Sequence, residues 1–129
     1  MNITIKTIPH SEQRYATVGD WWFDEAGDLQ IRVSRAPGNL PPVNDWKYEA
    51  MIAFHELAET LLCKDRGISV EMVDAFDKSF VQSEIIDEAG DHPNSPYRKE
   101  HFFATTVERL LAAELGVNWN DYADAVDEL

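Results

Sequence analysis

The first third of the chain alternates apolar and polar positions with a period near two, which indicates β-strands. Three short runs carry this pattern, at residues 3–8, 17–23 and 29–34. Between the last two runs, Glu25-Ala26-Gly27-Asp28 is typical of a turn, because glycine tolerates positive φ and aspartate bonds its own backbone. We therefore expect a small antiparallel three-stranded sheet that includes a hairpin.

The rest of the chain changes to the spacing of amphipathic helices. Residues 36–43 and 87–96 are rich in proline or glycine and predict two breaks. The predicted helices are 46–64 capped by Asn44 or Asp45 and ending before Gly67, 69–80 capped by Ser69, 97–115 stopped by Gly116, and a short last helix from Asn118 or Asn120.

This order of elements predicts an α+β fold in which the sheet precedes three to four packed helices. A chain of 129 residues fits one domain and can bury a core without disulfides or metal clips. We therefore expect a single domain over 1–129, with a β-rich part at 1–35 and a helical part at 45–129.

The formal net charge of -13 narrows the possible partners. Nucleic-acid binding depends on clustered lysine and arginine, so a phosphate backbone is not an expected ligand. No segment approaches the roughly 18 apolar residues of a membrane span. An acidic surface of this kind suits solubility, cation binding or a basic protein partner.

The amino terminus and the cysteine content both indicate a cytoplasmic protein. Residues 1–6 alternate apolar with polar side chains and lack the apolar core of a secretory signal. Cys63 is the single cysteine, so no intrachain disulfide can form. Its position beside Leu61 and Leu62 favours packing as a small apolar residue over a nucleophilic role.

The string His55-Glu56-Leu57-Ala58-Glu59 lies inside the longest predicted helix. Residues i and i+4 lie one above the other on a helix, so His55 and Glu59 can converge on one cation while Glu56 projects beside them. Metal-assisted hydrolysis requires this combination of ligands and a carboxylate base. A plain ion pair between His55 and Glu59 on the helix surface is the alternative.

This string resembles the H-E-x-x-H helix of zincin metallopeptidases, in which two histidines bind zinc and the glutamate activates a water molecule. The likeness covers roughly residues 20–80 and includes the strand at 29–34 before the helix. In that group an edge strand borders the substrate cleft, so the resemblance implies a peptide lying along 29–34. The chain departs from the pattern at Glu59, where zincins have their second histidine.

Such a site needs a further ligand. Asp74 and Asp77 stand one turn apart on the second predicted helix, and Asp77 is the leading choice. His101 is a third possibility, either as a ligand or as a group that donates its ring N–H to a carboxylate, and a core histidine is the alternative. Glu108 lies two turns after His101, and Arg98 can bind a substrate carboxylate or pair with an acid.

Two further resemblances compete with or extend this interpretation. Strings at residues 55–59, 67–68, 73–77 and 96–101 are similar to a set of small bacterial and phage-type proteins, which implies no particular activity. Glu56 and Glu59, followed by Glu71 and Asp74, resemble the E-x-x-E and E-x-x-D pair of all-α nucleotide pyrophosphohydrolases. Four carboxylates would then hold Mg²⁺ and cleave a nucleotide.

A third hypothesis is a non-catalytic inhibitor or adaptor. Its acidic surface and exposed aromatic residues, such as Trp21 and Trp22, would bind a basic partner. Paired tryptophans are more often packed in a core or on a sheet edge, because each ring hides a large area. The favoured expectation is a zinc-dependent hydrolase of peptides or small molecules, with Glu56 as the base.

Overall fold

The computed structural model describes residues 1–36, 42–80 and 88–129 of the chain. The strands are β1 (Ile3–Ile8), β2 (Gly19–Phe23) and β3 (Leu29–Ser34), with a short 3-10 helix η1 (His10–Glu12) after β1. The helices are α1 (Pro42–Asp65), α2 (Val70–Ser79), α3 (Arg98–Leu115) and α4 (Trp119–Asp127), with the 3-10 helix η2 (Ala89–Asp91) before α3. The expected α+β class is confirmed.

The sheet is mixed, so the expectation of an antiparallel sheet is wrong for one of its two strand pairs. The strand order is β1-β3-β2, with β2 antiparallel to β3 and β1 parallel to β3. The β2–β3 hairpin forms as predicted, and Gly27 in its turn has a φ of 81°. Because this hairpin occupies one edge of β3, β1 pairs with the other edge.

The segment between β1 and β2 passes the end of β3. Ile8 pairs with Ser34 and Gly19 pairs with Val33, so β1 ends and β2 begins beside the carboxyl end of β3. The Gln13 amide lies at this end and donates to the Ser34 hydroxyl at 3.0 Å. The expectation that 29–34 is an edge strand is therefore wrong, because β3 is the central strand and β2 is the edge strand that reaches the site.

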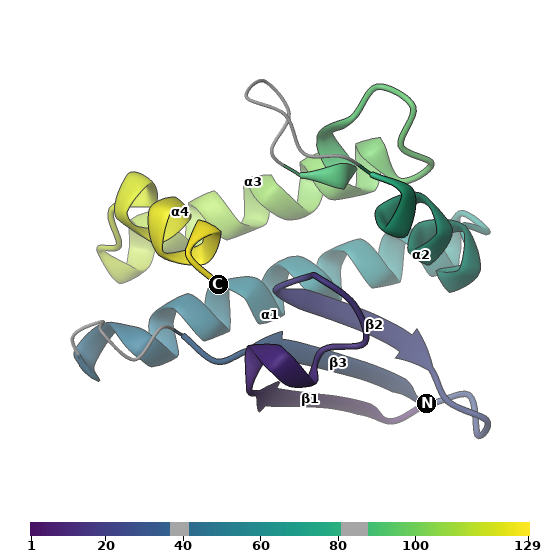
Figure 1. The fold of residues 1–129 in the computed structure, drawn as a ribbon, viewed down its shortest axis with the longest axis horizontal. Helices are drawn as coiled ribbons and strands as arrows, with labels where there is room; N and C mark the ends of the chain where they lie inside the picture. The colour runs from purple at the N-terminus through teal and green to yellow at the C-terminus, as the bar shows by residue number, and fades with distance from the viewer. Residues whose placement is uncertain (37–41, 81–87) are drawn as a thin grey trace.

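Helix α1 lies between the sheet and α3 (Figure 1). Leu29, Ile31 and Val33 of β3 are at most 1% exposed and form the core with Met51, Ile52 and further side chains of α1. Burying each of these side chains contributes about 1.5–3 kcal/mol. This packing fixes the rotation of α1, and therefore the direction in which its polar residues project.

The helix boundaries differ from the predicted ones mainly at the start of α1. The helix begins at Pro42, so Asn44 and Asp45 lie inside it and are not its N-cap. Proline is well tolerated in the first turn of a helix, where its missing N–H has no partner to lose. Residues 37–41 of the predicted loop and residue 87 of the second predicted break lie outside the described residues.

The other helix ends follow the sequence closely. Ser69 caps α2 by accepting a hydrogen bond from the Met72 N–H, and Asn118 rather than Asn120 caps α4. Gly116 ends α3 with a φ of 68°. Within the described ranges, no helix is both long and apolar enough to cross a membrane.

Candidate metal centre

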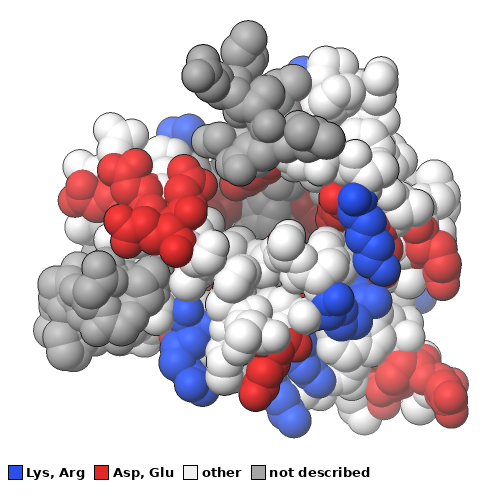
Figure 2. All heavy atoms as spheres, viewed as in Figure 1, with Lys and Arg blue, Asp and Glu red and all other residues white. Residues whose placement is uncertain are grey.

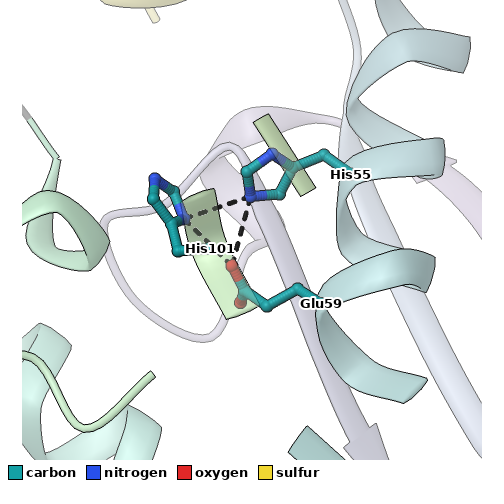
Figure 3. A group of neighbouring side chains, drawn as sticks. All are labelled: His55, Glu59 and His101. Carbon is teal, nitrogen blue, oxygen red and sulfur yellow. Dashed lines mark hydrogen bonds and ion pairs between the residues drawn. The ribbon is translucent and has the colours of Figure 1, made fainter. Parts of the chain in front are cut away.

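Three side chains from α1 and α3 point toward one another in the interior of the protein (Figure 3). The Nε2 atom of His55 lies 3.2 Å from Oε2 of Glu59 and 3.2 Å from Nδ1 of His101. The Nδ1 atom of His101 lies 3.0 Å from the same Glu59 oxygen. We call these three residues, His55, Glu59 and His101, the metal-ligand group, because their geometry suits one cation.

The spacing within the metal-ligand group can be compared with a zinc site. Two ligand atoms of a tetrahedral zinc ion are separated by roughly 3.3 Å, since each lies about 2.0–2.1 Å from the ion. The three observed separations of 3.0–3.2 Å are close to that value. Two imidazole nitrogens and a carboxylate oxygen also belong to the donor types that zinc prefers.

The atoms that do not face the centre of the group are held by other side chains. Nδ1 of His55 lies 2.7 Å from Glu108, and Nε2 of His101 lies 2.7 Å from Glu88. The Trp21 indole N–H donates to the second oxygen of Glu59 at 3.3 Å. Each potential ligand is therefore oriented by a hydrogen bond, as metal-bound histidines usually are.

The electrostatics of the group favour a cation. Burial opposes the charged forms, but hydrogen bonds with Glu59 and Glu88 outweigh it and raise the pKa of His101 to about 10. For Glu59, bonds with both histidines outweigh burial and lower the pKa to about 2. Bonds with Glu108 and Glu59 likewise raise the pKa of His55 against the effect of burial. The negative field that holds protons on both imidazoles equally attracts a metal ion.

Glu56 lies beside the metal-ligand group and is 8% exposed. Burial and the neighbouring Glu59 charge raise its pKa well above the usual range. In the described part of the chain, no side chain donates a hydrogen bond to its carboxylate. A carboxyl group of high pKa next to three potential metal ligands has the properties of a general base.

Two glycines make room for the site. A Cβ atom at Gly19 of β2 would lie 2.3 Å from Oε1 of Glu56, and a Cβ at Gly90 of η2 would lie 2.3 Å from the His101 ring. Any larger residue at these positions would displace the side chain that it faces. The edge of the sheet and the segment before α3 thus fix Glu56 and His101 by direct contact.

The site opens into a cavity of about 810 Å³ between the sheet edge, α2, α3 and α4. Figure 2 shows this face of the molecule hollowed near its centre, with acidic side chains to the left and right of the hollow. Besides the protonated imidazoles of the metal-ligand group, Lys78 and Arg109 are the cationic side chains in the lining as described. The acidic lining residues are Asp20, Glu56, Glu59, Asp74, Asp77, Glu88, Asp91, Glu108 and Asp127.

Asp77 and Asp74 lie in this cavity wall but outside the metal-ligand group. The hydroxyls of Tyr15 and Tyr97 donate to Asp77 at 3.0 and 2.5 Å. Burial outweighs these bonds and raises the pKa of Asp77 to about 6. Asp74 accepts a hydrogen bond from Arg14, which also binds Asp20 and so links α2 to β2.

The remaining predicted site residues have different positions. Glu108 bonds His55 and accepts a hydrogen bond from Tyr122, so it orients a potential ligand. Arg98 is exposed at the start of α3 and does not line the cavity. Cys63 is fully buried, and burial raises its pKa to about 12, which agrees with a packing role.

Two features of the alternative hypotheses are wrong. The all-α pyrophosphohydrolase would need Glu71 beside the other carboxylates, whereas the fold contains a sheet and Glu71 is exposed outside the cavity. Trp21, expected to be exposed in an adaptor, is 3% exposed. Its indole N–H donates a hydrogen bond to Glu59. The guanidinium carbon of Arg32 lies 5.0 Å from the centre of the Trp22 ring, so the two side chains stack.

Some functional positions had no signal in the sequence pattern. Glu88 and Tyr122 lie far along the chain from the residues they orient, and Gly19 and Gly90 resemble ordinary turn or strand glycines. Comparison of the chain with protein families, curated proteins and solved structures finds no match.

Proposed function

We propose that the protein is a zinc-dependent hydrolase of amide or ester bonds, related in design to the zincin metallopeptidases. The observation that carries the proposal is that His55, Glu59 and His101 each aim one atom at a common point, while Glu108, Trp21 and Glu88 hold the other atom. A network that only filled a core would not require three ligand atoms to converge on one point at zinc-like separations.

The donor set also argues for zinc over magnesium. Magnesium prefers six oxygen ligands in octahedral geometry, whereas two of the three donors here are imidazole nitrogens. Three protein ligands leave a fourth tetrahedral position for water or substrate, which is typical of catalytic zinc. A bound zinc ion would lower the pKa of water and polarise a substrate carbonyl.

In this proposal Glu56 is the general base. Its carboxylate accepts the proton of the attacking water and later delivers a proton to the leaving group. Gly19 holds it on the side of the group that faces the edge strand β2. The substrate lies in the cavity along β2, whose outer edge does not pair with another strand in the described sheet.

The experiment that tests the proposal measures metal and activity on the same variants. Untagged wild-type protein should bind one zinc ion per chain and hydrolyse a set of short peptide amides and esters. His101→Ala should lose zinc, and Glu56→Gln should keep zinc while kcat falls by roughly 10²–10⁴-fold. Zinc content is measured by elemental analysis and by titration calorimetry.

His92→Gln is the matched control, because His92 does not line the cavity and packs against Phe76 instead. This variant should keep both zinc and activity. Stoichiometric zinc that persists in His101→Ala, or its absence from wild type refolded with zinc, would contradict the proposed site. Full hydrolysis by Glu56→Gln would contradict the assigned base.

A further inference from the structure

A second surface of the protein carries exposed apolar side chains, on the side of α1 and α3 that faces away from the metal centre. We call it the α1–α3 face. Phe54, Leu61, Phe103 and Leu110 on it are 43–65% exposed, and a small groove between the two helices separates them. The residues of the face are Phe54, Leu57, Ala58, Leu61, Leu62, Phe103, Val107 and Leu110.

The face is opposite the site because of helix periodicity. On α1, His55 and Glu59 point inward, whereas Phe54, Leu57 and Leu61 lie on the other side of the helix. The groove between the helices has a volume of about 310 Å³ and is lined by apolar residues of both. A contact made there would leave the cavity and the metal-ligand group open.

We infer that a second copy of this chain covers the α1–α3 face and forms a symmetric dimer. The face exposes on the order of 500 Å² of apolar surface, near the upper end of what monomers leave uncovered. Covering it on two copies would bury about 1,000 Å², which is the lower limit for a biological interface and fits a dimer that dissociates on dilution.

The charges at the ends of the face make it complementary to itself. On α3, Lys99, Phe103, Val107, Leu110 and Glu114 follow one another at steps of three or four residues and form one stripe. The stripe begins with an exposed lysine and ends with an exposed glutamate. An antiparallel copy of the same stripe therefore brings Lys99 opposite Glu114.

Helix α1 offers a second partner for the same lysine. Helices α1 and α3 are antiparallel neighbours, since Arg66 bonds Glu100 at one end and Lys47 bonds the Leu115 carbonyl at the other (Figure 1). The exposed Asp65 thus lies at the Lys99 end of the face. A two-fold axis across the helices pairs Lys99 with Glu114, and an axis along them pairs Lys99 with Asp65.

The choice of a second copy over an unrelated partner follows from this symmetry and from the net charge. At -13, the chain repels copies of itself over most of its surface. The α1–α3 face has no acidic residue within its apolar part, and its end charges alternate in sign. It is therefore a surface on which two copies can meet without that repulsion.

The test measures mass in solution by light scattering and sedimentation, with the full chain over a wide concentration range. Wild type should approach twice 14.7 kDa as concentration rises. Phe103→Glu should weaken the dimer by roughly a hundredfold, because it places a charge in the centre of the interface. A mass of 14.7 kDa for wild type at every concentration overturns the inference.

Met72→Glu is the matched control, because Met72 is similarly exposed at 47% but lies on α2. It should associate like wild type. Far-ultraviolet circular dichroism and a cooperative thermal unfolding transition show whether each variant is folded. Loss of association in Met72→Glu equal to that in Phe103→Glu would contradict the location of the interface.

Charge reversal tests the arrangement without touching the apolar residues. Lys99→Glu should weaken the dimer roughly five-fold, since an exposed ion pair contributes only modestly and symmetry repeats it. Adding Glu114→Lys should restore association if the axis crosses the helices, and adding Asp65→Lys if it runs along them. Failure of both second changes to restore it overturns the charge-paired dimer.

Discussion

At the scale of single residues, the geometry of the site depends on which atom of each ligand side chain is held by a hydrogen bond to a neighbour outside the metal-ligand group. His55 presents Nε2 and His101 presents Nδ1 to the centre, because Glu108 and Glu88 hold the opposite nitrogens. Glu59 is fixed in the same way by Trp21. This orientation lowers the entropy that the ligands lose when an ion binds, so the affinity depends on residues that do not touch the ion.

Gly19→Ala should reduce catalysis without removing the metal. The new methyl group would occupy the place of the Glu56 carboxylate, while His55, Glu59 and His101 stay free of it. A displacement of about 1 Å in a catalytic group costs roughly 10²-fold in rate. The measurement is kcat on the best peptide substrate, together with zinc content.

Gly27→Ala provides the control for this change. Gly27 has a φ of 81° and no neighbouring atom within 4 Å of the added carbon, so the variant loses stability in the hairpin turn but leaves the site intact. We expect it to unfold about 1 kcal/mol more easily and to keep its kcat. An unchanged kcat in Gly19→Ala would show that Glu56 does not act where the contact with Gly19 holds it.

At the scale of elements, the sequence predicted those features that depend on the short-range pattern of apolar and polar residues. The β2–β3 hairpin follows from alternation around Gly27, and the 55–59 motif faces inward because α1 buries its apolar stripe. The sequence did not predict which strand is central, because β1 pairs with β3 through a contact distant in the chain. Strand order depends on such tertiary contacts, which periodicity does not report.

The same distinction explains what the sequence revealed of the site. His55 and Glu59 are one turn apart, so helix geometry alone brings them together. His101 was one of three possible further ligands. The packing of α3 on α1 places it beside His55 and Glu59, whereas Asp77 lies outside the group, and the sequence pattern does not report this packing. Glu88 comes from the segment before η2 and Trp21 from β2, and no local pattern encodes where either segment is placed.

Helix α4 supports the metal-ligand group from outside it. Tyr122 donates to Glu108, which holds His55, so Tyr122→Phe should weaken zinc binding by about ten-fold. Removal of a buried hydrogen bond should also cost about 1 kcal/mol of folding stability. Titration calorimetry measures the affinity, and denaturant unfolding of the metal-free protein measures the stability.

Tyr48→Phe is the matched change. The Tyr48 ring packs edge-on against Tyr122 at 5.2 Å, in the same part of the core. Because Tyr48 does not bond Glu108, its variant should bind zinc like wild type. Equal affinities for Tyr122→Phe and wild type would mean that α4 does not contribute to ligand orientation.

At the scale of the whole molecule, charge would select among the substrates of the proposed hydrolase. The acidic lining of the cavity adds to a net charge of -13, and the field inside a hollow is stronger than on a flat surface. If the protein is the proposed hydrolase, a positively charged substrate would therefore be concentrated at the cavity, and an anionic one would be repelled. Arg14 reduces this field between Asp20 and Asp74, and Lys78 and Arg109 reduce it where they line the cavity.

Substrate charge should therefore change the specificity constant. Between two otherwise identical peptides, one carrying lysine and one glutamate beside the scissile bond, kcat/KM should favour the lysine peptide by at least about ten-fold at low ionic strength. The difference should shrink as salt is added, because screening shortens the range of the field. Equal values for both peptides, or a preference for glutamate, would exclude this role of the cavity charge.

The reactivity of the single thiol of the chain can report how often the core opens. Cys63 is 0% exposed in α1, at the junction of the helix with the core. A thiol reagent can reach it only in molecules that have transiently separated α1 from its neighbours. The native chain therefore carries its own chemical reporter of unfolding, and labelling kinetics can compare the stability of any variant without an engineered probe.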